Sequence, residues 1–411
     1  MTMVLSDNKW AGWIAVAIGF SIPISTSLDN ILLALLLALW LLEGRFREKV
    51  SSALDNPIVI PALMLFGIYV LGLFYGVATW HDALGSLKKA ANLLLILVMI
   101  PIFKEEKLRH FAIWGFLGAV CLTMLLSYLI WVGVIEPNNF FKGDQDEPVV
   151  FKLRITHSLL MAYGAYLFLL KARQCISKPS GILFGVLALA AFYNVFFMVA
   201  SKTSYIVALA LGVYFIVSHW SWRSTGIAVL FLMILFGTIY KLPSSTPHQR
   251  VLLMYNEAKQ WQPGQSDHSS TGDRLEFLTN SLRLIRENPI WGAGTGGFKG
   301  AYAALVKDTK MDPSDNPHNE YLMVTVQTGV MGLGLMLWLF IVQWRMAPLL
   351  PDSFDFLAAR GLVILIVSAS LVTSTLIDHT EGLFYVWMSA LLFAGWKSAG
   401  DQGARPCRSP L

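Results

Sequence analysis

Three basic residues, Lys202, Arg274 and His318, stand at positions where positive charge is unfavourable unless it has a function. Lys202 lies alone in the short polar turn Ser201–Ser204, between two long apolar stretches. A lysine at the centre of a bilayer costs roughly 2.5–3.5 kcal/mol, so a basic residue between apolar segments is a candidate functional residue. The alternative is a lysine whose ammonium group extends to the lipid headgroups.

Arg274 belongs to the run Asp273-Arg274-Leu275-Glu276, which predicts the start of a helix with Asp273 as its N-cap. Apolar residues at helical spacing continue this helix until Pro289 ends it. An arginine near a helix N-terminus opposes the macrodipole, but guanidinium and free backbone N–H groups together bind the oxygens of an anion. The alternative is a solvated arginine whose charge is offset by Asp273 and Glu276.

His318 follows Asn316 and Pro317, which predict an N-cap and a first helical residue, so His318 is expected in the first turn of a helix. The positive end of that helix disfavours the imidazolium form. A neutral imidazole at neutral pH can act as a general base. The alternative is an interfacial histidine with no chemical role.

Other basic residues are weaker candidates. Lys88 and Lys89 lie at the outward end of an apolar stretch, where they can equally extend to the membrane interface. Arg154 and His157 lie at the outward mouth of another apolar stretch, beside the other basic residues.

The sequence predicts no metal site. Asp144 and Asp146 resemble the paired aspartates of nucleotide-sugar enzymes, but so short a pattern is expected by chance in an acidic loop. Asp378, His379 and Glu381 share one outward turn and could bind a cation or accept protons, but a fourth metal ligand is lacking.

The glycines after Pro289 form a separate motif, at Gly292, Gly294, Gly296 and Gly297. No strand precedes them and no Gly-Lys-Ser/Thr follows, as a phosphate-binding loop would require. Tight turns are therefore expected.

The composition places these residues in a membrane protein. Of 411 residues, 55% are hydrophobic and 14% charged, whereas soluble proteins carry about 25% charged residues. Many stretches are long enough to cross a bilayer as helices, and the alternation of a membrane barrel is missing. The net charge of +5 reflects cytoplasmic loops and not a nucleic-acid partner. The fold class is therefore predicted to be all-α and polytopic.

About twelve transmembrane helices are expected, at residues 10–26, 29–43, 57–76, 83–103, 110–132, 156–171, 181–200, 203–218, 224–240, 319–342, 358–377 and 382–396. Lys and Arg of the short loops gather on one side, which predicts that both termini are cytoplasmic. The chain would then divide into nine spans, a large outward loop with amphipathic helices, three spans and a cytoplasmic tail, at residues 1–240, 241–318, 319–396 and 397–411.

Three stretches resemble the superfamily of O-antigen ligases and O-antigen polymerases of bacterial inner membranes. They are Ser201–Ser204, Pro289–Phe298 and His318–Gly332. The superfamily usually has Ser-Arg where this chain has Ser201-Lys202, so the positive charge is kept and the bidentate fork is lost. The likeness also covers the topology, with the large loop before the last three spans.

The resemblance implies a glycosyltransferase of lipopolysaccharide biosynthesis that depends on a lipid-linked oligosaccharide. As an O-antigen ligase, it would transfer a glycan from undecaprenyl-pyrophosphate to a lipid A-core sugar hydroxyl, without metal or cofactor and with inversion. His318 would be the general base, and Arg274, Lys202 and Arg154 would bind the pyrophosphate. The implied partners are donor, acceptor and membrane lipid. The active site would be periplasmic and the protein located in the inner membrane.

Three other functions remain open. An O-antigen polymerase and a protein O-oligosaccharyltransferase belong to the same superfamily, although one large loop before the last three spans favours a ligase. A membrane transporter would explain the spans, but its cations should lie near the middle of the bilayer on broken helices. Here they lie at the outward ends of the apolar stretches.

Overall fold

The computed structural model is built of helices. It describes residues 9–136, 141–199, 201–219, 226, 246–262, 264, 269–376 and 378–396, and every regular element among these residues is a helix. The predicted all-α fold is thus confirmed for the described part of the chain.

Six helical segments of the described chain are long and apolar enough to cross a membrane. They are α5 (Trp80–Ala90) with its continuation α6 (Leu95–Phe103), α7 (Glu106–Trp131), α8 (Arg154–Gln174), α9 (Pro179–Tyr193) with a π-turn to Met198, α10 (Lys202–His219), and α15 (Glu320–Met346) with a short 3₁₀ extension. Helix α2 (Thr26–Leu42) and α3 (Phe46–Leu54), bent by 115°, would together make a seventh. The expected total of twelve stays a prediction, and the expected span 224–240, apart from residue 226, lies outside the described residues.

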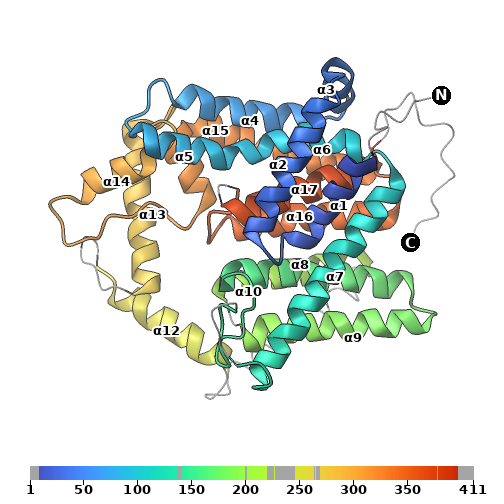
Figure 1. Cartoon of the computed structure of the whole chain (residues 1–411). Coiled ribbons are helices and arrows are strands. Elements are labelled where there is room, and N and C mark those ends of the chain that lie inside the picture. The colour runs from blue at the N-terminus through green and yellow to red at the C-terminus, as the bar shows by residue number, and fades with distance from the viewer. Residues whose placement is uncertain are drawn as a thin grey trace.

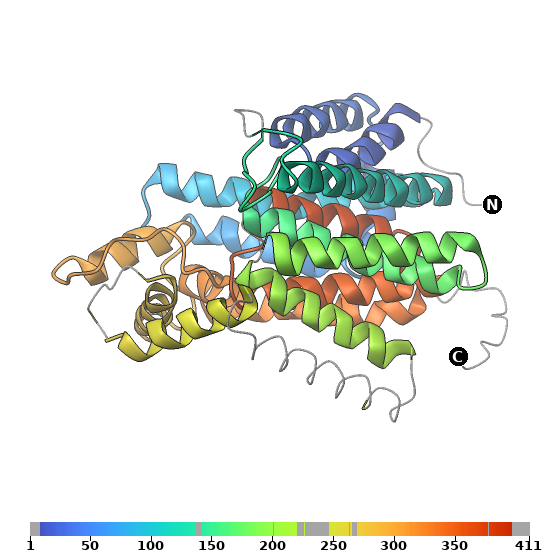
Figure 2. The same ribbon diagram turned by 90° about the horizontal axis from the view of Figure 1, so that it is seen from below.

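Seven further helices of the described chain complete the bundle and one of its ends. Within the bundle lie α1 (Lys9–Ser21), α4 (Val59–Gly72), α16 (Ser353–Ala369) and α17 (His379–Phe393). Three more, α12 (Thr246–Gln260), α13 (Ser270–Glu287) and α14 (Gly297–Val306), gather at one end, opposite the end where α1 begins and α17 finishes (Figures 1 and 2). We call the end with α12, α13 and α14 the loop end. Helix α13 runs across this end and not along the bundle.

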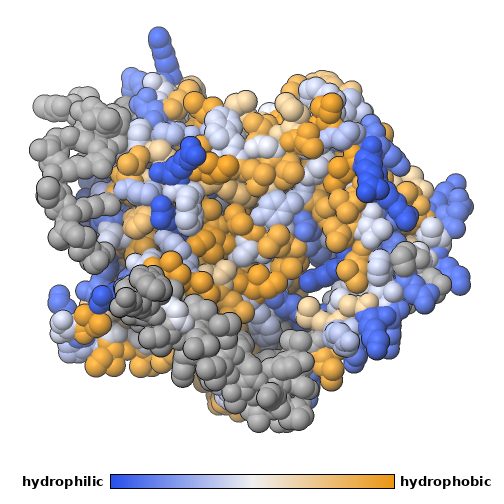
Figure 3. All heavy atoms as spheres, turned by 180° about the vertical axis from the view of Figure 1, so that it is seen from behind, coloured by the Kyte–Doolittle hydropathy of each residue, from blue (hydrophilic) through white to orange (hydrophobic). Residues whose placement is uncertain are grey.

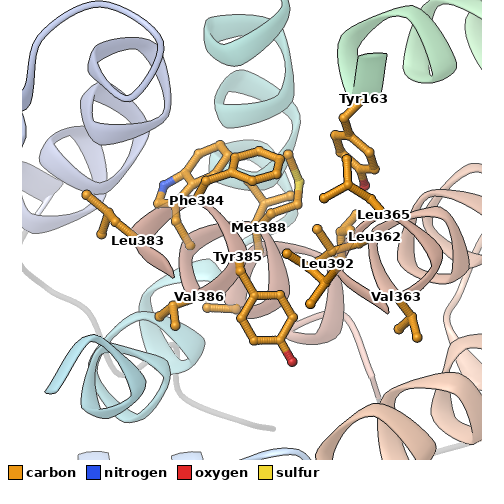
Figure 4. Packing of buried hydrophobic residues seen from close by; sticks show 14 of the residues in the cluster. Tyr163, Leu362, Val363, Leu365, Leu383, Phe384, Tyr385, Val386, Met388 and Leu392 are labelled. Atoms are coloured by element: carbon orange, nitrogen blue, oxygen red, sulfur yellow. The ribbon is translucent and has the colours of Figure 1, made fainter. Parts of the chain in front are cut away.

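Helix α17 forms the centre of the core because nearly all its side chains are buried. Phe384 and Met388 point into the packed interior beside Leu362 and Leu365 of α16 (Figure 4). The Tyr385 hydroxyl donates to Gln343 Oε1 at 2.8 Å. This bond gives the buried hydroxyl a hydrogen-bond partner, which lipid cannot provide. The face of the molecule seen in Figure 3 is broadly hydrophobic over its middle, with hydrophilic residues mostly toward its margins.

Helix α15 is broken at Gly329, where the backbone adopts φ 64° and ψ −168°. The segment after α13 fits into this break. The N–H groups of Ala293 and Gly294 donate to the carbonyls of Val326 and Gln327, and Val330 N–H donates to Pro289. Three glycines of this segment also have positive φ, at Gly292, Gly294 and Gly296, so the predicted tight turns are confirmed there, whereas Gly297 begins helix α14.

Replacing Gly329 with alanine is expected to lower the free energy of unfolding by about 2 kcal/mol or more, because positive φ is strained for alanine. The new Cβ would also lie 1.9 Å from the carbonyl oxygen of Ile290. Thermal unfolding in detergent measures the effect. Gly334→Ala is the matched control in the same helix, since open space surrounds its Cβ position. Equal melting temperatures for the two variants would contradict the strain.

Candidate functional site

Arg274 is carried by α13, which begins four residues earlier than the sequence indicates. The N-cap is Ser269, whose side chain accepts from Gly272 N–H, so the prediction of Asp273 as N-cap is wrong. Ser269 takes the cap position because its hydroxyl reaches the backbone N–H of Gly272, the third residue of α13. Arg274 therefore lies in the second turn, away from the strongest part of the helix dipole. The predicted end before Pro289 is confirmed, because α13 stops at Glu287.

His318 lies just before α15 and not within its first turn. The N-cap of α15 is Asn319, whose side chain accepts from Leu322 N–H, so the prediction of Asn316 as N-cap is wrong. Instead, Asn316 Oδ1 accepts from His318 N–H and from the Ser374 hydroxyl, each at 2.8 Å. This side-chain turn holds His318 at φ 50°, a left-handed conformation that few non-glycine residues adopt.

The fold brings Arg274 and His318 together. Phe277, one turn after Arg274 on α13, lies against the imidazole with ring centroids 6.0 Å apart. Burial lowers the pKa of His318 from its ordinary value of 6.5, and the nearby charge of Arg274 lowers it further. The imidazole is therefore neutral at neutral pH, as the sequence predicts, but burial and Arg274 are the causes. Burial also lowers the pKa of Arg274, although a guanidinium remains charged at any physiological pH.

Lys202 is the first residue of α10 and faces the start of α13. Its ammonium lies 3.7 Å from Glu257 Oε2 of α12 and 3.4 Å from the hydroxyl of Thr271. Only 16% of the Lys202 side chain and 13% of the Glu257 side chain are exposed. Lys202 is thus mostly buried against the helices of the loop end. The residues that sequence analysis missed here are Glu257 and Thr271.

Arg154 is bound elsewhere. Its guanidinium pairs with Glu147, with Nε 3.3 Å from Oε1, and both side chains are about two-fifths exposed. His157, on the same helix, is buried, and its Nε2 lies 3.1 Å from Asn194 Oδ1. Asn194 in turn donates to the Ser127 hydroxyl. The His157 ring is therefore packed inside the bundle, beside Asn194.

The other weaker candidates lie at helix ends or in loops. Lys88 and Lys89 are exposed in the last turn of α5. Asp378 caps α17 by accepting from His379 N–H. His379 Nε2 lies 3.0 Å from Asn30 Oδ1 at the start of α2. Asp144 uses Oδ1 to accept from the N–H groups of its own turn, which gives this aspartate a structural role.

A buried charged cluster joins distant parts of the chain, and sequence analysis missed two of its members, Asp29 and Lys152. Lys152 Nζ lies 3.6 Å from Asp29 Oδ2, and burial lowers the pKa of this lysine. Asp29 also accepts from the Ser21 hydroxyl, and Glu381 accepts from Thr156, each at 2.5 Å. Removing one partner of a buried ion pair destabilises the protein, because the remaining charge is buried without compensation. The cluster therefore fixes the loop that leads into α8.

A groove of about 1290 Å³ opens at the loop end, between α4, α13 and α14. Its lining is mainly apolar and includes Leu71, Phe74, Trp291, Ala301 and Leu305. The opposite face of α14 carries Tyr302, whose ring packs against those of Phe277 and Phe298. The groove thus lies on one side of α13 and α14, and the Arg274–His318 pair lies on the other.

Comparison with known proteins places this geometry in context. Residues 183–337 match the family described as O-antigen ligase, and this range contains Lys202, Arg274 and His318. The O-antigen ligase of Salmonella typhimurium (strain LT2) is 22% identical over 355 residues, which cover 82% of this chain and 84% of that protein. The resemblance to the O-antigen ligase superfamily is thereby confirmed.

A distantly similar chain occurs in a solved structure, "Structural coordination of polymerization and crosslinking by a peptidoglycan synthase complex". The match has a TM-score of 0.47 and 14% sequence identity, and it covers 82% of this chain and 95% of that one.

Proposed function

We propose that this member of the O-antigen ligase superfamily transfers a glycan from undecaprenyl-pyrophosphate to a hydroxyl of a lipid A-core sugar. Membership implies a glycosyltransferase-type enzyme of lipopolysaccharide biosynthesis. The apolar helices accord with a multi-pass protein of the inner membrane. The donor, the acceptor, a periplasmic site and the residue roles below are parts of the proposal.

One observation carries the proposal: a neutral histidine lies beside a partly buried arginine at the loop end of a membrane bundle. Arg274 and His318 are 44 positions apart in the sequence (318 minus 274), yet the charge of one acts on the pKa of the other. Lys202 adds a second cation near the start of the helix that carries Arg274. A base and anion-binding cations are the two functions that this transfer requires.

The residues would divide the chemistry between them. His318 accepts the proton of the acceptor hydroxyl while its oxygen forms a bond to the anomeric carbon. The bond from that carbon to the pyrophosphate oxygen breaks, and the electron pair stays on the leaving pyrophosphate. Arg274 and Lys202 stabilise this developing negative charge, as preorganised cations do. Attack from the face opposite the leaving group inverts the anomeric carbon.

The location of the site suits two lipid-linked substrates. Carrier and acceptor both have lipid anchors in the membrane and reacting groups outside it. The apolar groove between α4, α13 and α14 offers a surface on which lipid chains can lie near the site. Arg154, which pairs with Glu147, would need to leave that carboxylate to bind pyrophosphate, so its role is secondary.

The pH dependence of kcat/KM tests the base. His318 works as a base only when neutral, so activity falls as pH drops through its pKa, which lies below 6.5. Arg274→Gln removes a charge that lowers this pKa, so the acidic limb of its residual activity should move to higher pH. Transfer from a synthetic donor, measured between about pH 4 and 8, gives the acidic limb of the unchanged protein and that of Arg274→Gln. A limb at the same pH in the two proteins would contradict the assignment.

A lipopolysaccharide gel of a strain that lacks this protein tests the function itself. A ligase predicts lipid A-core without any attached repeats. Core carrying a single repeat would indicate an O-antigen polymerase instead, because the first unit is still attached. Normal lipopolysaccharide would exclude both functions. Expression of the intact chain should restore the original pattern.

A further inference from the structure

The cationic region beside α13 already contains an internal anion, the carboxylate of Glu257. Its Oε2 lies 3.7 Å from Lys202 Nζ and accepts from Thr271 N–H at 3.1 Å. Thr271 is the second residue of α13, so its N–H is one of the groups at a helix start that have no partner within the helix. One carboxylate oxygen therefore contacts both a lysine and a helix N-terminus.

These contacts are the ones that a phosphate oxygen would make. Backbone N–H groups at a helix start and a lysine ammonium are common ligands of phosphate. The Glu257 side chain is largely buried, so its negative charge is not weakened by full contact with water. A phosphate and this carboxylate cannot occupy the same position, and they repel one another if both remain nearby.

We propose that Glu257 substitutes for a phosphate of the donor while the site is empty and leaves Lys202 and Thr271 when pyrophosphate binds. The inference rests on the proposed function, which assigns Lys202 to the pyrophosphate. Glu257 is then a positioning residue: it holds Lys202 in place before the donor arrives. It also competes with the pyrophosphate group that remains on the carrier after transfer, and so favours product release.

Pyrophosphate binding to the purified full-length protein in detergent tests this competition. Glu257→Gln keeps the size and the hydrogen-bond acceptor of the side chain but removes its charge. Isothermal titration with inorganic pyrophosphate should give a Kd about three- to tenfold lower for this variant than for the unchanged protein, the size expected when one ion-pair competitor is removed. Glu287→Gln is the matched control, since it removes the same charge from an exposed position at the end of α13 and should leave Kd unchanged.

Two further measurements separate competition from a structural effect. In the Lys202→Met background, Glu257→Gln should lower Kd by less, because the lysine that both anions share is absent and only the Thr271 N–H remains shared. With donor and acceptor, Glu257→Gln should lower the donor KM without raising kcat, the pattern of uniformly tighter binding. A change in folding alone would not tighten binding.

Several outcomes would overturn the inference. They are an unchanged or higher Kd in Glu257→Gln, a gain of the same size without Lys202, or no pyrophosphate binding by the unchanged protein. The proposed function fails by a different result, normal lipopolysaccharide in the deletion strain. A protein that ligates normally but shows no effect of Glu257→Gln on pyrophosphate affinity would remove only the inference.

Discussion

Replacing His318 with alanine is expected to lower the turnover of glycan transfer by about 10²–10⁴-fold, the usual contribution of a general base. The imidazole is kept neutral by burial and by Arg274, so it is ready to accept a proton at neutral pH. The measurement is single-turnover transfer from a synthetic undecaprenyl-pyrophosphate donor to purified lipid A-core. Donor affinity should change little, because His318 is assigned to the acceptor hydroxyl.

His318→Asn is the control that separates chemistry from backbone conformation. His318 has φ 50°, and asparagine tolerates this left-handed region better than most residues. The asparagine variant should keep the melting temperature of the unchanged protein and still lose the activity. His81→Ala removes a histidine whose side chain is 98% exposed and should remain active. Transfer at the normal rate by either His318 variant would remove the base assignment.

Arg274→Ala is expected to lower turnover by about 10²–10³-fold, the effect of removing one preorganised group that stabilises transition-state charge. Donor affinity should fall as well, because in the proposed mechanism the guanidinium binds the pyrophosphate before and during transfer. Arg274→Lys should recover part of the loss, since lysine keeps the charge but not the two-pronged geometry. The same single-turnover assay, with pyrophosphate titration, separates the effects on rate and affinity.

Arg286→Ala is the matched control for this prediction, because Arg286 is an exposed arginine in the last turn of the same helix. It should leave turnover and donor affinity unchanged. Equal losses of turnover in Arg274→Ala and Arg286→Ala would show that any positive charge on α13 supports the reaction, and not Arg274 in particular. Normal turnover and normal pyrophosphate affinity in Arg274→Ala would exclude its role in binding the leaving group.

The sequence by itself determined the fold class, and it singled out Lys202, Arg274 and His318 as candidate residues. Long apolar stretches can satisfy their backbone groups in lipid only as helices, so an all-α membrane bundle follows from composition. Lys202, Arg274 and His318 were identified because positive charge is costly or unusual at their positions. Pro289 marks the end of α13 because proline cannot donate within a helix, and the structure confirms that end.

Local helix starts were less well determined, because several polar residues near each start can cap. Ser269 and Asn319 cap α13 and α15, although Asp273 and Asn316 also fit the sequence pattern. At His318 the tertiary structure decided the outcome. Ser374, 58 positions away, also donates to the Asn316 oxygen that holds the turn, and no local pattern contains that contact.

Tertiary structure decided the partners of Lys202 and Glu381. Glu257 meets Lys202 only because α12 and α13 fold against the start of α10, and Thr156 reaches Glu381 across 225 positions. A charge in the sequence shows that a partner or a function is needed. Which carboxylate approaches which cation depends on helix packing, because ion pairs act over a few ångströms whatever the separation along the chain. The sequence therefore supplied the candidate groups, and the packing of the loop end decided that His318 lies near Arg274 and that Lys202 pairs with Glu257.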